Sequence, residues 1–290
     1  MDRVEIYRSV DNAIRKGQEP YSVLRTLPLD AVGALLLDLP QEFEAVRREL
    51  PAMASDDVQD SWTGSHGYTL LLQSCAFARI LENGYMRHTG RRLDDRKILD
   101  YGCGWGRLIR LMYKFTAPAN IYGCDPWDKS IELCRQSRLA GNFALSHYIP
   151  AGPPFEGEKF DLIYAFSVFT HLSERCGKAV AAACRESIKD EGLLAITIRP
   201  PSYWEVHDQA QNVVNVEAMK DAHATKGFAF TPHRRDAIDG DITYGDASMT
   251  LEYIEKNWTG WKVVGIDYYL QDPYQLIVYL KPDGIRSSLG

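Results

Sequence analysis

The sequence predicts an α/β fold built on a doubly wound, mostly parallel sheet. From Lys97 onward, short apolar runs alternate with longer amphipathic segments, as expected for strands joined by helices that cover both faces of a sheet. A glycine-rich stretch, "KILDYGCGWGRLIRLM" at 97–112, joins the first apolar run to the first helical segment. The last two apolar runs, 261–269 and 274–282, flank a Gln-Asp-Pro turn and predict a closing antiparallel hairpin.

The elements of the central part follow from their periodicity. Strands are predicted at "KILDY" (97–101), "NIYGCD" (120–125), "FDLIYAF" (160–166) and "GLLAITI" (192–198). The helix expected after the first strand places four apolar side chains on one face: Trp105, Leu108, Ile109 and Met112. Further helices are predicted over about 126–138 and from Ser173, where Cys176, Val180 and Cys184 share one side.

Three other segments surround this core, which we place at 96–198. Residues 1–95 predict a helical N-terminal extension, in which Tyr68, Leu71, Leu72 and Cys75 have helical spacing. Residues 199–247 are rich in Pro, His, Tyr and Asp and too long for a routine connection, so they predict a lid insertion over the substrate. Residues 248–290 predict a helix over about 248–257 and the hairpin that completes the core.

Composition narrows the classes of partner and compartment. The chain has 290 residues, 45% of them hydrophobic and 25% charged, with a net charge of −6. This charge gives no global attraction to nucleic acid or an anionic membrane, and no apolar run approaches the ~20 residues of a membrane span. The six cysteines are scattered without a C-x-x-C pair, and the N-terminus does not resemble a signal peptide, so a cytoplasmic protein is predicted. The oligomeric state is not predicted.

The glycines point to a ligand at the end of the first strand. Gly102, Gly104 and Gly106 lie at a strand-to-helix turn, where ligands of open α/β sheets bind. Glycine permits positive φ and leaves no Cβ between backbone and ligand, while a helix N-terminus offers free N–H groups. The spacing is G-x-G-x-G with Asp100 two residues before it, whereas a dinucleotide site has G-x-G-x-x-G. A nicotinamide-dependent oxidoreductase is therefore the weaker alternative.

This stretch resembles motif I of the class I S-adenosylmethionine-dependent methyltransferases, whose fold is Rossmann-like. "IYGCDPW" places Asp125 where that family has an acid that accepts both ribose hydroxyls. "FDLIYAFSVFTHL" is similar to the family's fourth strand, and "ESIKDEGLLAITI" to its next helix, turn and fifth strand. The resemblance spans about residues 97–198. It implies S-adenosyl-L-methionine as cofactor and methyl transfer as activity.

The resemblance also implies the cofactor contacts. Asp125 would hold the ribose, although before Pro126 it is also a plausible helix N-cap. Asp100 would approach the methionine ammonium or orient the turn, and Arg107 would contact a carboxylate or remain a solvated arginine. In similar enzymes a helix before motif I folds over the cofactor, which adds contacts near "TGSHGY" at 63–68. The complete set is Ser65, Tyr68, Asp100, Gly102, Gly104, Gly106, Arg107, Asp125, Pro126 and Phe166.

Adenine is where the chain departs from the family. The family often has an acid after the third strand that accepts the adenine amino group. The segment "FALSHYIPAGPPFEGEKF" offers no acid until Glu156. Backbone around His147 to Pro150 is the predicted alternative.

The acceptor is expected to be a small molecule, with a hydroxyl of a sugar, glycan or secondary metabolite preferred. His171 follows the fourth strand in "VFTHL", where similar enzymes present the acceptor, so it is the first candidate base; its alternative is to brace the turn before Ser173. An unperturbed imidazole near pKa ~6.5 is mostly neutral at cellular pH and accepts a proton. The next candidates are His207, His233, Tyr244 and Asp246.

The remaining expectations concern metal ions, the walls of the acceptor pocket and the possibility of binding without catalysis. The histidines lack metal-ligand spacing such as H-E-x-x-H, so no metal is predicted. Within the predicted lid, Tyr203 and Trp204 would shape the acceptor pocket together with Tyr244 and Asp246. A protein that binds S-adenosylmethionine without turnover, or acts as a scaffold, is the remaining alternative.

Overall fold

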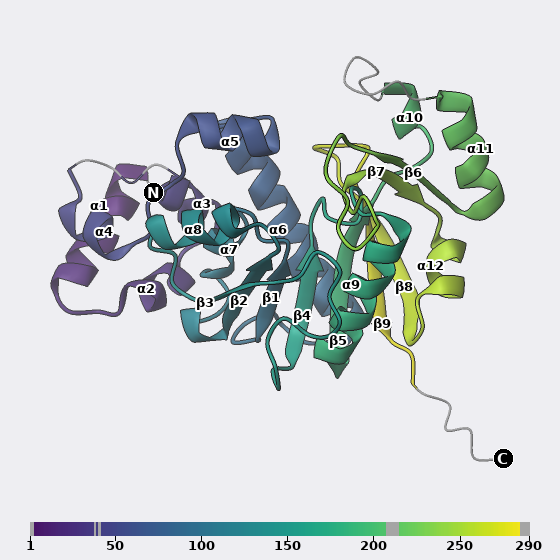
Figure 1. The fold of residues 1–290 in the computed structure, drawn as a ribbon. Coiled ribbons are helices and arrows are strands. Elements are labelled where there is room, and N and C mark those ends of the chain that lie inside the picture. The colour runs from purple at the N-terminus through teal and green to yellow at the C-terminus, as the bar shows by residue number, and fades with distance from the viewer. Residues whose placement is uncertain (1–2, 38, 40–41, 207–214, 285–290) are drawn as a thin grey trace. The chain divides into compact units, whose positions relative to one another are not determined.

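The computed structural model describes residues 3–37, 39, 42–206 and 215–284 (Figure 1). It contains a seven-stranded sheet and a separate two-stranded sheet. The chain divides into two compact units, residues 1–86 with 91–145 and residues 87–90 with 146–290. The predicted α/β class, the helical N-terminal region and the closing antiparallel hairpin are confirmed. Within the described ranges, no helix is both long and apolar enough to cross a membrane.

The N-terminal part is helical because its apolar residues recur at helical spacing. Leu29, Val32, Leu35 and Leu36 are all buried on one short helix. The helices of this part are α1 (Arg3–Arg15), α2 (Pro20–Thr26), α3 (Leu29–Leu37), α4 (Glu44–Glu49), α5 (Asp56–Thr63) and α6 (Gly67–Thr89).

The first unit contributes three parallel strands in the order β3-β2-β1. They are β1 (Ile98–Tyr101), β2 (Ile121–Asp125) and β3 (Asn142–Leu145), connected through α7 (Ile109–Met112), a 3₁₀ turn (Pro118–Asn120) and α8 (Asp128–Gln136). All four residues of β1 are buried. The helix expected from Trp105 is wrong in its start, because α7 begins only at Ile109 and residues 102–108 form turns. Three glycines of this stretch have positive φ, which is incompatible with an α-helix.

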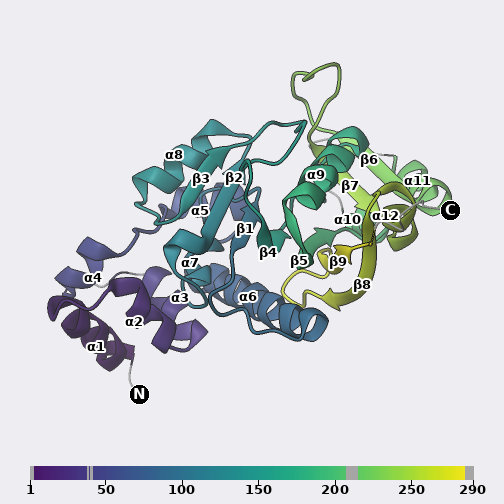
Figure 2. The ribbon, with the colours of Figure 1, turned by 90° about the horizontal axis from the view of Figure 1, so that it is seen from below.

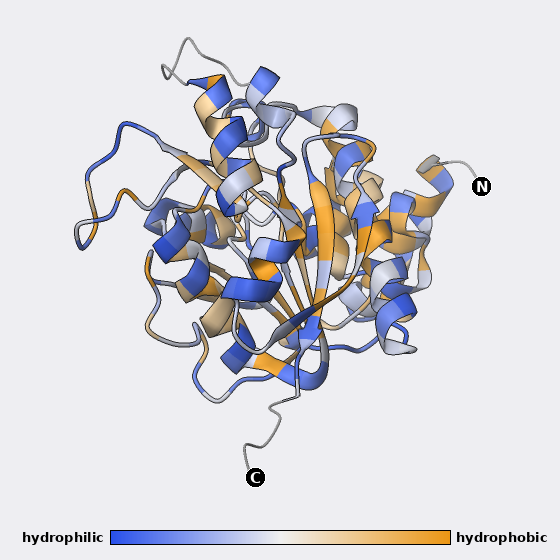
Figure 3. Ribbon diagram, turned by 90° about the vertical axis from the view of Figure 1, so that its right-hand side faces the viewer, coloured by the Kyte–Doolittle hydropathy of each residue, from blue (hydrophilic) through white to orange (hydrophobic). Residues whose placement is uncertain are grey.

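The second unit contributes strands in the order β4-β5-β9-β8. They are β4 (Phe160–Ala165), β5 (Ile188–Ile198), β8 (Trp261–Tyr268) and β9 (Leu276–Pro282). β4 and β5 are parallel, whereas β9 pairs antiparallel with both β5 and β8. Figure 3 shows how the hydrophobic colour concentrates on the strands. Ser173 caps α9 (Glu174–Ser187) by accepting the Cys176 N–H at 3.2 Å, which confirms the predicted helix start.

The segment predicted as a lid contains regular structure. It includes α10 (Tyr203–Val206), α11 (Val216–Lys226) and the strands β6 (Phe228–Pro232) and β7 (Gly245–Met249), which form the two-stranded antiparallel sheet. α10 and α11 pack beside this sheet (Figures 1 and 2), with Trp204 and Ala229 buried between them. The helix expected from about 248 starts later, at α12 (Leu251–Asn257). The reason is that residues 245–249 pair with β6.

The short helix α4 depends on a side chain from α1. Its own N-cap residue, Phe43, makes no side-chain capping bond. Asp11 replaces that cap, because its Oδ1 accepts the N–H groups of Ala45 at 2.9 Å and Val46 at 3.2 Å. Burial raises the pKa of Asp11, but the hydrogen bond from Arg15 and those backbone N–H groups outweigh it and lower the pKa overall.

We expect Asp11→Ala to lower the free energy of unfolding by about 1–3 kcal/mol, because two buried N–H groups lose their acceptor. Glu44→Ala is the matched control, since its side chain is 79% exposed in the first turn of the same helix. Urea unfolding of both variants measures the difference. Because folding lowers the pKa of Asp11, its stabilisation depends on pH. The stabilisation is fully present above the pKa of Asp11 in the unfolded chain, near 3.9, and is lost as the pH falls through its pKa in the folded protein. Equal stabilities of the two variants would contradict this role.

Candidate active site

The glycine turn of the first unit is held by the end of the neighbouring strand. The N–H groups of Gly102 and Cys103 donate to the carbonyl of Cys124 at 2.8 and 2.9 Å. Gly104 has φ +53° and Gly106 has φ +78°, both in the region that favours glycine. A Cβ on Gly106 would lie 2.1 Å from Leu139 Cδ1, so the Leu139 side chain would have to shift to admit any other residue there.

Asp125 joins the turn to the start of the next helix. Its Oδ2 accepts the Gly104 N–H at 3.0 Å, and its Oδ1 accepts the Trp127 N–H at 2.9 Å. Burial raises the pKa of this carboxyl, and the two N–H groups oppose that rise. Each carboxylate oxygen has a second lone pair, so the group retains the capacity to accept two hydroxyls of a vicinal diol. Asp125 is not the N-cap residue of α8, the alternative role considered for it, because that position belongs to Trp127.

A buried arginine that the sequence analysis missed supports the same turn. Arg110 donates to the carbonyls of Trp105 at 3.1 Å, Gly106 at 2.8 Å and Ala52 at 2.6 Å. Burial lowers the pKa of Arg110 to about 10, so it stays charged at neutral pH. An arginine inside "IRLM" gives no signal in the sequence that distinguishes it from a solvated one.

In the second unit, a buried ion pair lies after the end of β5. Arg199 and Asp246 are 7% and 5% exposed, and the Arg199 guanidinium donates to Asp246 Oδ1. The Tyr203 hydroxyl donates to the same oxygen at 2.9 Å, and His233 Nε2 lies 2.8 Å from Oδ2. The Arg199 guanidinium also donates to the carbonyl of Thr170 at 2.9 Å. The Asp246 carboxylate is thus fixed from several sides.

His171 lies against this ion pair with both ring nitrogens engaged. Nδ1 lies 2.7 Å from the carbonyl of Gly245, and Nε2 lies 3.2 Å from a guanidinium nitrogen of Arg199. A carbonyl only accepts and a guanidinium only donates, so Nδ1 carries the hydrogen and Nε2 accepts. The ring stacks on Tyr244 with centroids 4.9 Å apart. Burial and the charge of Arg199 lower the pKa of His171 to about 3, in contrast to the ordinary value expected from sequence.

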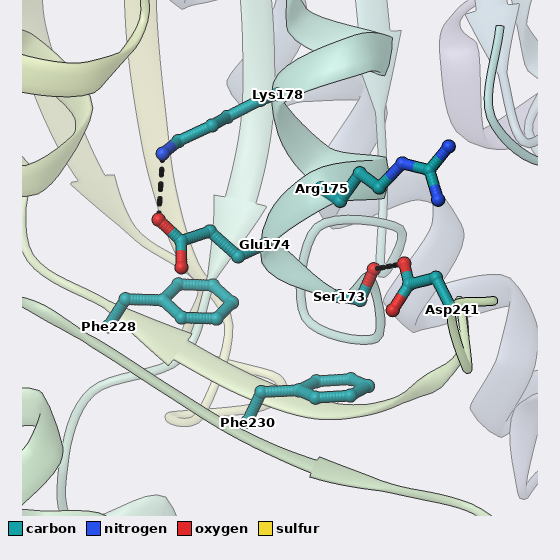
Figure 4. Close-up of a pocket in the computed structure, with 7 residues that line it drawn as sticks. All are labelled: Ser173, Glu174, Arg175, Lys178, Phe228, Phe230 and Asp241. Atoms are coloured by element: carbon teal, nitrogen blue, oxygen red, sulfur yellow. Dashed lines mark hydrogen bonds and ion pairs between the residues drawn. The ribbon is translucent and has the colours of Figure 1, made fainter.

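A pocket of about 680 Å³ lies on the other face of the small sheet. Phe228 and Phe230 alternate with Ala229 and Thr231 along β6, and Thr231 pairs with Asp246, so the two phenyl rings face away from the ion pair. Figure 4 shows the rings opposite the first turn of α9. The lining residues are Ser173, Glu174, Arg175, Lys178, Phe228, Phe230 and Asp241. Glu174 pairs with Lys178 at 2.7 Å, and Ser173 donates to Asp241.

Comparison with known families decides the class of the central segment. Residues 98–192 match the sequence model of a family described as "Methyltransferase domain". This range begins with β1, contains the glycine turn, Asp125 and β4, and ends within β5. Residues 98–192 form a class I methyltransferase domain. The cofactor of this class is S-adenosylmethionine.

Curated relatives of the methyltransferase domain have different acceptors in their names. The chain is 28% identical over 141 residues to the sterol 24-C-methyltransferase erg6 of Aspergillus fumigatus, covering 46% of this chain and 37% of that protein. It is 28% identical over 105 residues to the ubiquinone biosynthesis O-methyltransferase of Bartonella tribocorum, covering 36% and 41%. It is 28% identical over 113 residues to the demethylmenaquinone methyltransferase of Thermotoga maritima, covering 38% and 47%. The chain therefore spans less than half the length of each of these relatives.

Among solved structures, the fold is similar to that of DesVI from Streptomyces venezuelae. The TM-score is 0.51 at 14% sequence identity, and the match covers 80% of this chain and 99% of that one. This likeness agrees with the class I fold of the methyltransferase domain.

The residues predicted from sequence fall into both units. The first unit holds the glycine turn, Asp125 and the buried Asp100, together with Arg107 and Pro126. It also holds Ser65, whose hydroxyl donates to Gln73 at 3.0 Å, and Tyr68, which is 60% exposed.

The second unit brings four of the five candidate catalytic residues together: His171, His233, Tyr244 and Asp246. His207 lies outside the described residues. Phe166 belongs to this unit, where it packs edge-on against Tyr269 at 5.4 Å. The described residues include no group of three or more His, Cys, Asp or Glu side chains arranged to hold a metal ion. The roles of all these residues stay predictions.

The lowered pKa of His171 predicts that the folded state loses stability as the pH falls below neutrality. In the unfolded chain His171 is protonated below pH ~6.5. In the folded protein its ring stays neutral down to about pH 3. The free energy of unfolding should therefore fall by up to about 1.4 kcal/mol per pH unit as pH drops through this window. Burial also lowers the pKa of His88 and His223, so a variant is needed to isolate His171.

His171→Phe should be less stable at neutral pH but should show a shallower loss of stability between pH 7 and pH 5. Chemical unfolding at several pH values measures this slope. His147→Phe is the control, because His147 is exposed, and its slope should equal that of the wild type. The assignment fails if His171→Phe retains the wild-type slope.

Proposed function

We propose that this protein transfers the methyl group of S-adenosylmethionine to a hydroxyl of a small molecule, such as a sugar, glycan or secondary metabolite. The observation that carries the proposal is the bond pair at Asp125, which ties the glycine turn to the helix start within a methyltransferase domain. When bound, the cofactor supplies a methyl group on a positively charged sulfur.

The residues of the first unit would hold the cofactor. Asp125 would accept the ribose hydroxyls, and the backbone at Gly104 would allow close approach, since an added Cβ there meets only ordinary contacts at 3.7 Å. Asp100, 3% exposed beside the turn, is suited to an ammonium group. Ser65, Tyr68, Arg107 and Pro126 are the further contacts that we propose within this unit, and Phe166 of the second unit stays a contact expected from the sequence alone.

Oxygen as the acceptor atom is supported by the pairing of His233 with Asp246. A carboxylate only accepts, so in the neutral ring Nε2 carries the hydrogen and Nδ1 keeps a lone pair. An imidazole oriented by a buried carboxylate is the usual arrangement of a general base. The side chain of His233 is 29% exposed, whereas that of Asp246 is 7% exposed. We therefore assign the proton of the acceptor hydroxyl to His233 Nδ1.

His171 is less suited to take that proton. Its Nε2 already accepts from Arg199, and its low pKa makes it a weak base. It orients Arg199 and the loop at Gly245 instead. The names of the relatives include both C- and O-methyltransferases, so the preference for oxygen rests on His233 and Asp246.

Asp125→Ala should weaken binding of S-adenosylmethionine by about ten- to a hundredfold, because charge-assisted hydrogen bonds of about 1.5–3 kcal/mol are lost. Isothermal calorimetry with the cofactor and with S-adenosylhomocysteine measures the change. Asp128→Ala is the matched control, an exposed acid in the first turn of α8, and should bind normally. Unchanged affinity of a folded Asp125→Ala variant would contradict the proposed ribose contact.

His233→Ala should lower kcat by about 10²–10⁴ while leaving cofactor affinity unchanged, because only the proton transfer loses its base. Radiolabelled methyl transfer to a panel of sugars, phenols and quinols identifies the acceptor used for this measurement. Arg234→Ala, an exposed neighbour, serves as the control. Partial recovery of His233→Ala at high pH is expected as the acceptor hydroxyl ionises. Normal kcat in this variant would refute His233 as the base, and cofactor binding without transfer to any acceptor would favour the silent binding protein.

A further inference from the structure

Two tryptophans of the first unit stack on each other beside the glycine turn, and neither is buried in the hydrophobic core. Trp62, in the last turn of α5, lies on Trp127 with ring centroids 4.7 Å apart and planes inclined by 12°. Trp62 is half-buried and Trp127 is 44% exposed. The other tryptophans, Trp105, Trp204, Trp258 and Trp261, are each at most 4% exposed. The stacked pair is thus distinguished by its exposure as well as by its place.

Trp62 covers the face of the turn that glycine leaves bare. A Cβ built on Gly104 would meet Cε3 and Cζ3 of Trp62, both at 3.7 Å. These are ordinary van der Waals distances, so the six-membered ring of the indole lies over Gly104 with room for about one methyl group between them. A ligand that approached Gly104 from this face would meet the indole first.

Trp127 is placed by the residue that would hold the ribose. Its N–H donates to Asp125 Oδ1, and the Gly104 N–H donates to Oδ2 of the same carboxylate. Gly104, Asp125 and Trp127 therefore frame one site, and the Trp62 indole lies within that frame. A ribose bound at Asp125 carries its base one glycosidic bond away. Indole and purine are both flat, fused five- and six-membered rings, so both fit against an aromatic face.

We infer that Trp62 occupies the place on Trp127 that the base of the nucleoside takes, so that the cofactor binds only after Trp62 leaves the glycine turn. This inference rests on the proposed function, because it requires a nucleoside cofactor at Asp125. The Trp62 indole acts as an internal competitor. The apparent affinity is then the intrinsic affinity multiplied by the fraction of chains in which the site is open.

The helix that carries Trp62 is suited to such a movement. α5 has eight residues, of which Gln59 is buried. Its N-cap residue, Ser55, makes no side-chain capping bond, and Gly64 ends the helix at φ +72°. Elements with few buried side chains open at low free-energy cost. α5 can therefore move Trp62 without unfolding the strands of the first unit.

The two tryptophans should respond to substitution with opposite signs. Trp62→Ala removes the competitor and should tighten binding of S-adenosylhomocysteine by about two- to tenfold. Trp127→Ala removes the surface on which the base stacks and should weaken it by about ten- to a hundredfold. Calorimetry measures both values, with Tyr268→Ala, an exposed aromatic of the second unit, as the control. A pair with a merely structural role would give losses in both variants.

A spectroscopic measurement on the unmodified chain tests the same inference without a substitution at risk of misfolding. Two stacked indoles give an exciton-coupled circular-dichroism signal, which Trp62→Phe should abolish. Saturation with S-adenosylhomocysteine, or with adenosine alone, should remove this signal from the wild type. Methionine should leave it unchanged, because it carries no base.

The outcomes separate this inference from the proposed function. If S-adenosylhomocysteine binds the wild type, but Trp62→Ala binds no more tightly or the coupled signal persists at saturation, the inference is overturned and the proposed function stands. If neither the wild type nor Trp62→Ala binds S-adenosylhomocysteine or S-adenosylmethionine, the proposed function falls and this inference falls with it. Tighter binding by Trp62→Ala together with loss of the coupled signal supports both.

Discussion

The Asp125 carboxylate accepts the N–H of Gly104 with one oxygen and the N–H of Trp127 with the other, and the arrangement of the first unit's site depends on this pair of bonds. Strand register brings the groups together, since β1 and β2 are parallel with Tyr101 opposite Cys124. The turn after β1 and the acid that ends β2 thus share one edge of the sheet. Burial opposes the charge on Asp125, and the two N–H groups preserve it.

The parts of this site that were predictable from sequence are those whose residues lie within one short stretch of the chain. Glycine spacing after an apolar run and an acid at the end of the next one are visible within short windows. The helix expected from Trp105 was wrong because its apolar spacing suits a helix, whereas the flanking glycines take positive φ and leave Trp105 buried in a turn. Trp62 was missed because its position over Gly104 brings together distant parts of the chain, and no periodicity predicts such a neighbour.

In the second unit, the sequence predicted the candidate residues but not the electrostatic interactions between them. Sequence identified His171, His233, Tyr244 and Asp246 as candidates, and the structure gathers these four side chains. It did not identify Arg199, whose buried guanidinium binds Asp246 and occupies His171 Nε2. An ordinary pKa was assumed for His171 because burial and a neighbouring charge cannot be read from a linear pattern. The proposed division of roles between the two histidines therefore depends on tertiary contacts alone.

The small sheet of β6 and β7 places different chemistry on its two faces. Thr231 and Asp246 share one face, which bears the ion pair, whereas Phe230 lies on the opposite face and lines the pocket. Side chains alternate along a strand with a period of two, so a deletion of a single residue within β6 would exchange the faces. A phenyl ring would then replace a small side chain on the face that bears the ion pair of Arg199 and Asp246. Homologues that differ in length within this strand should therefore differ by an even number of residues or by a β-bulge, which absorbs one residue without exchanging the faces.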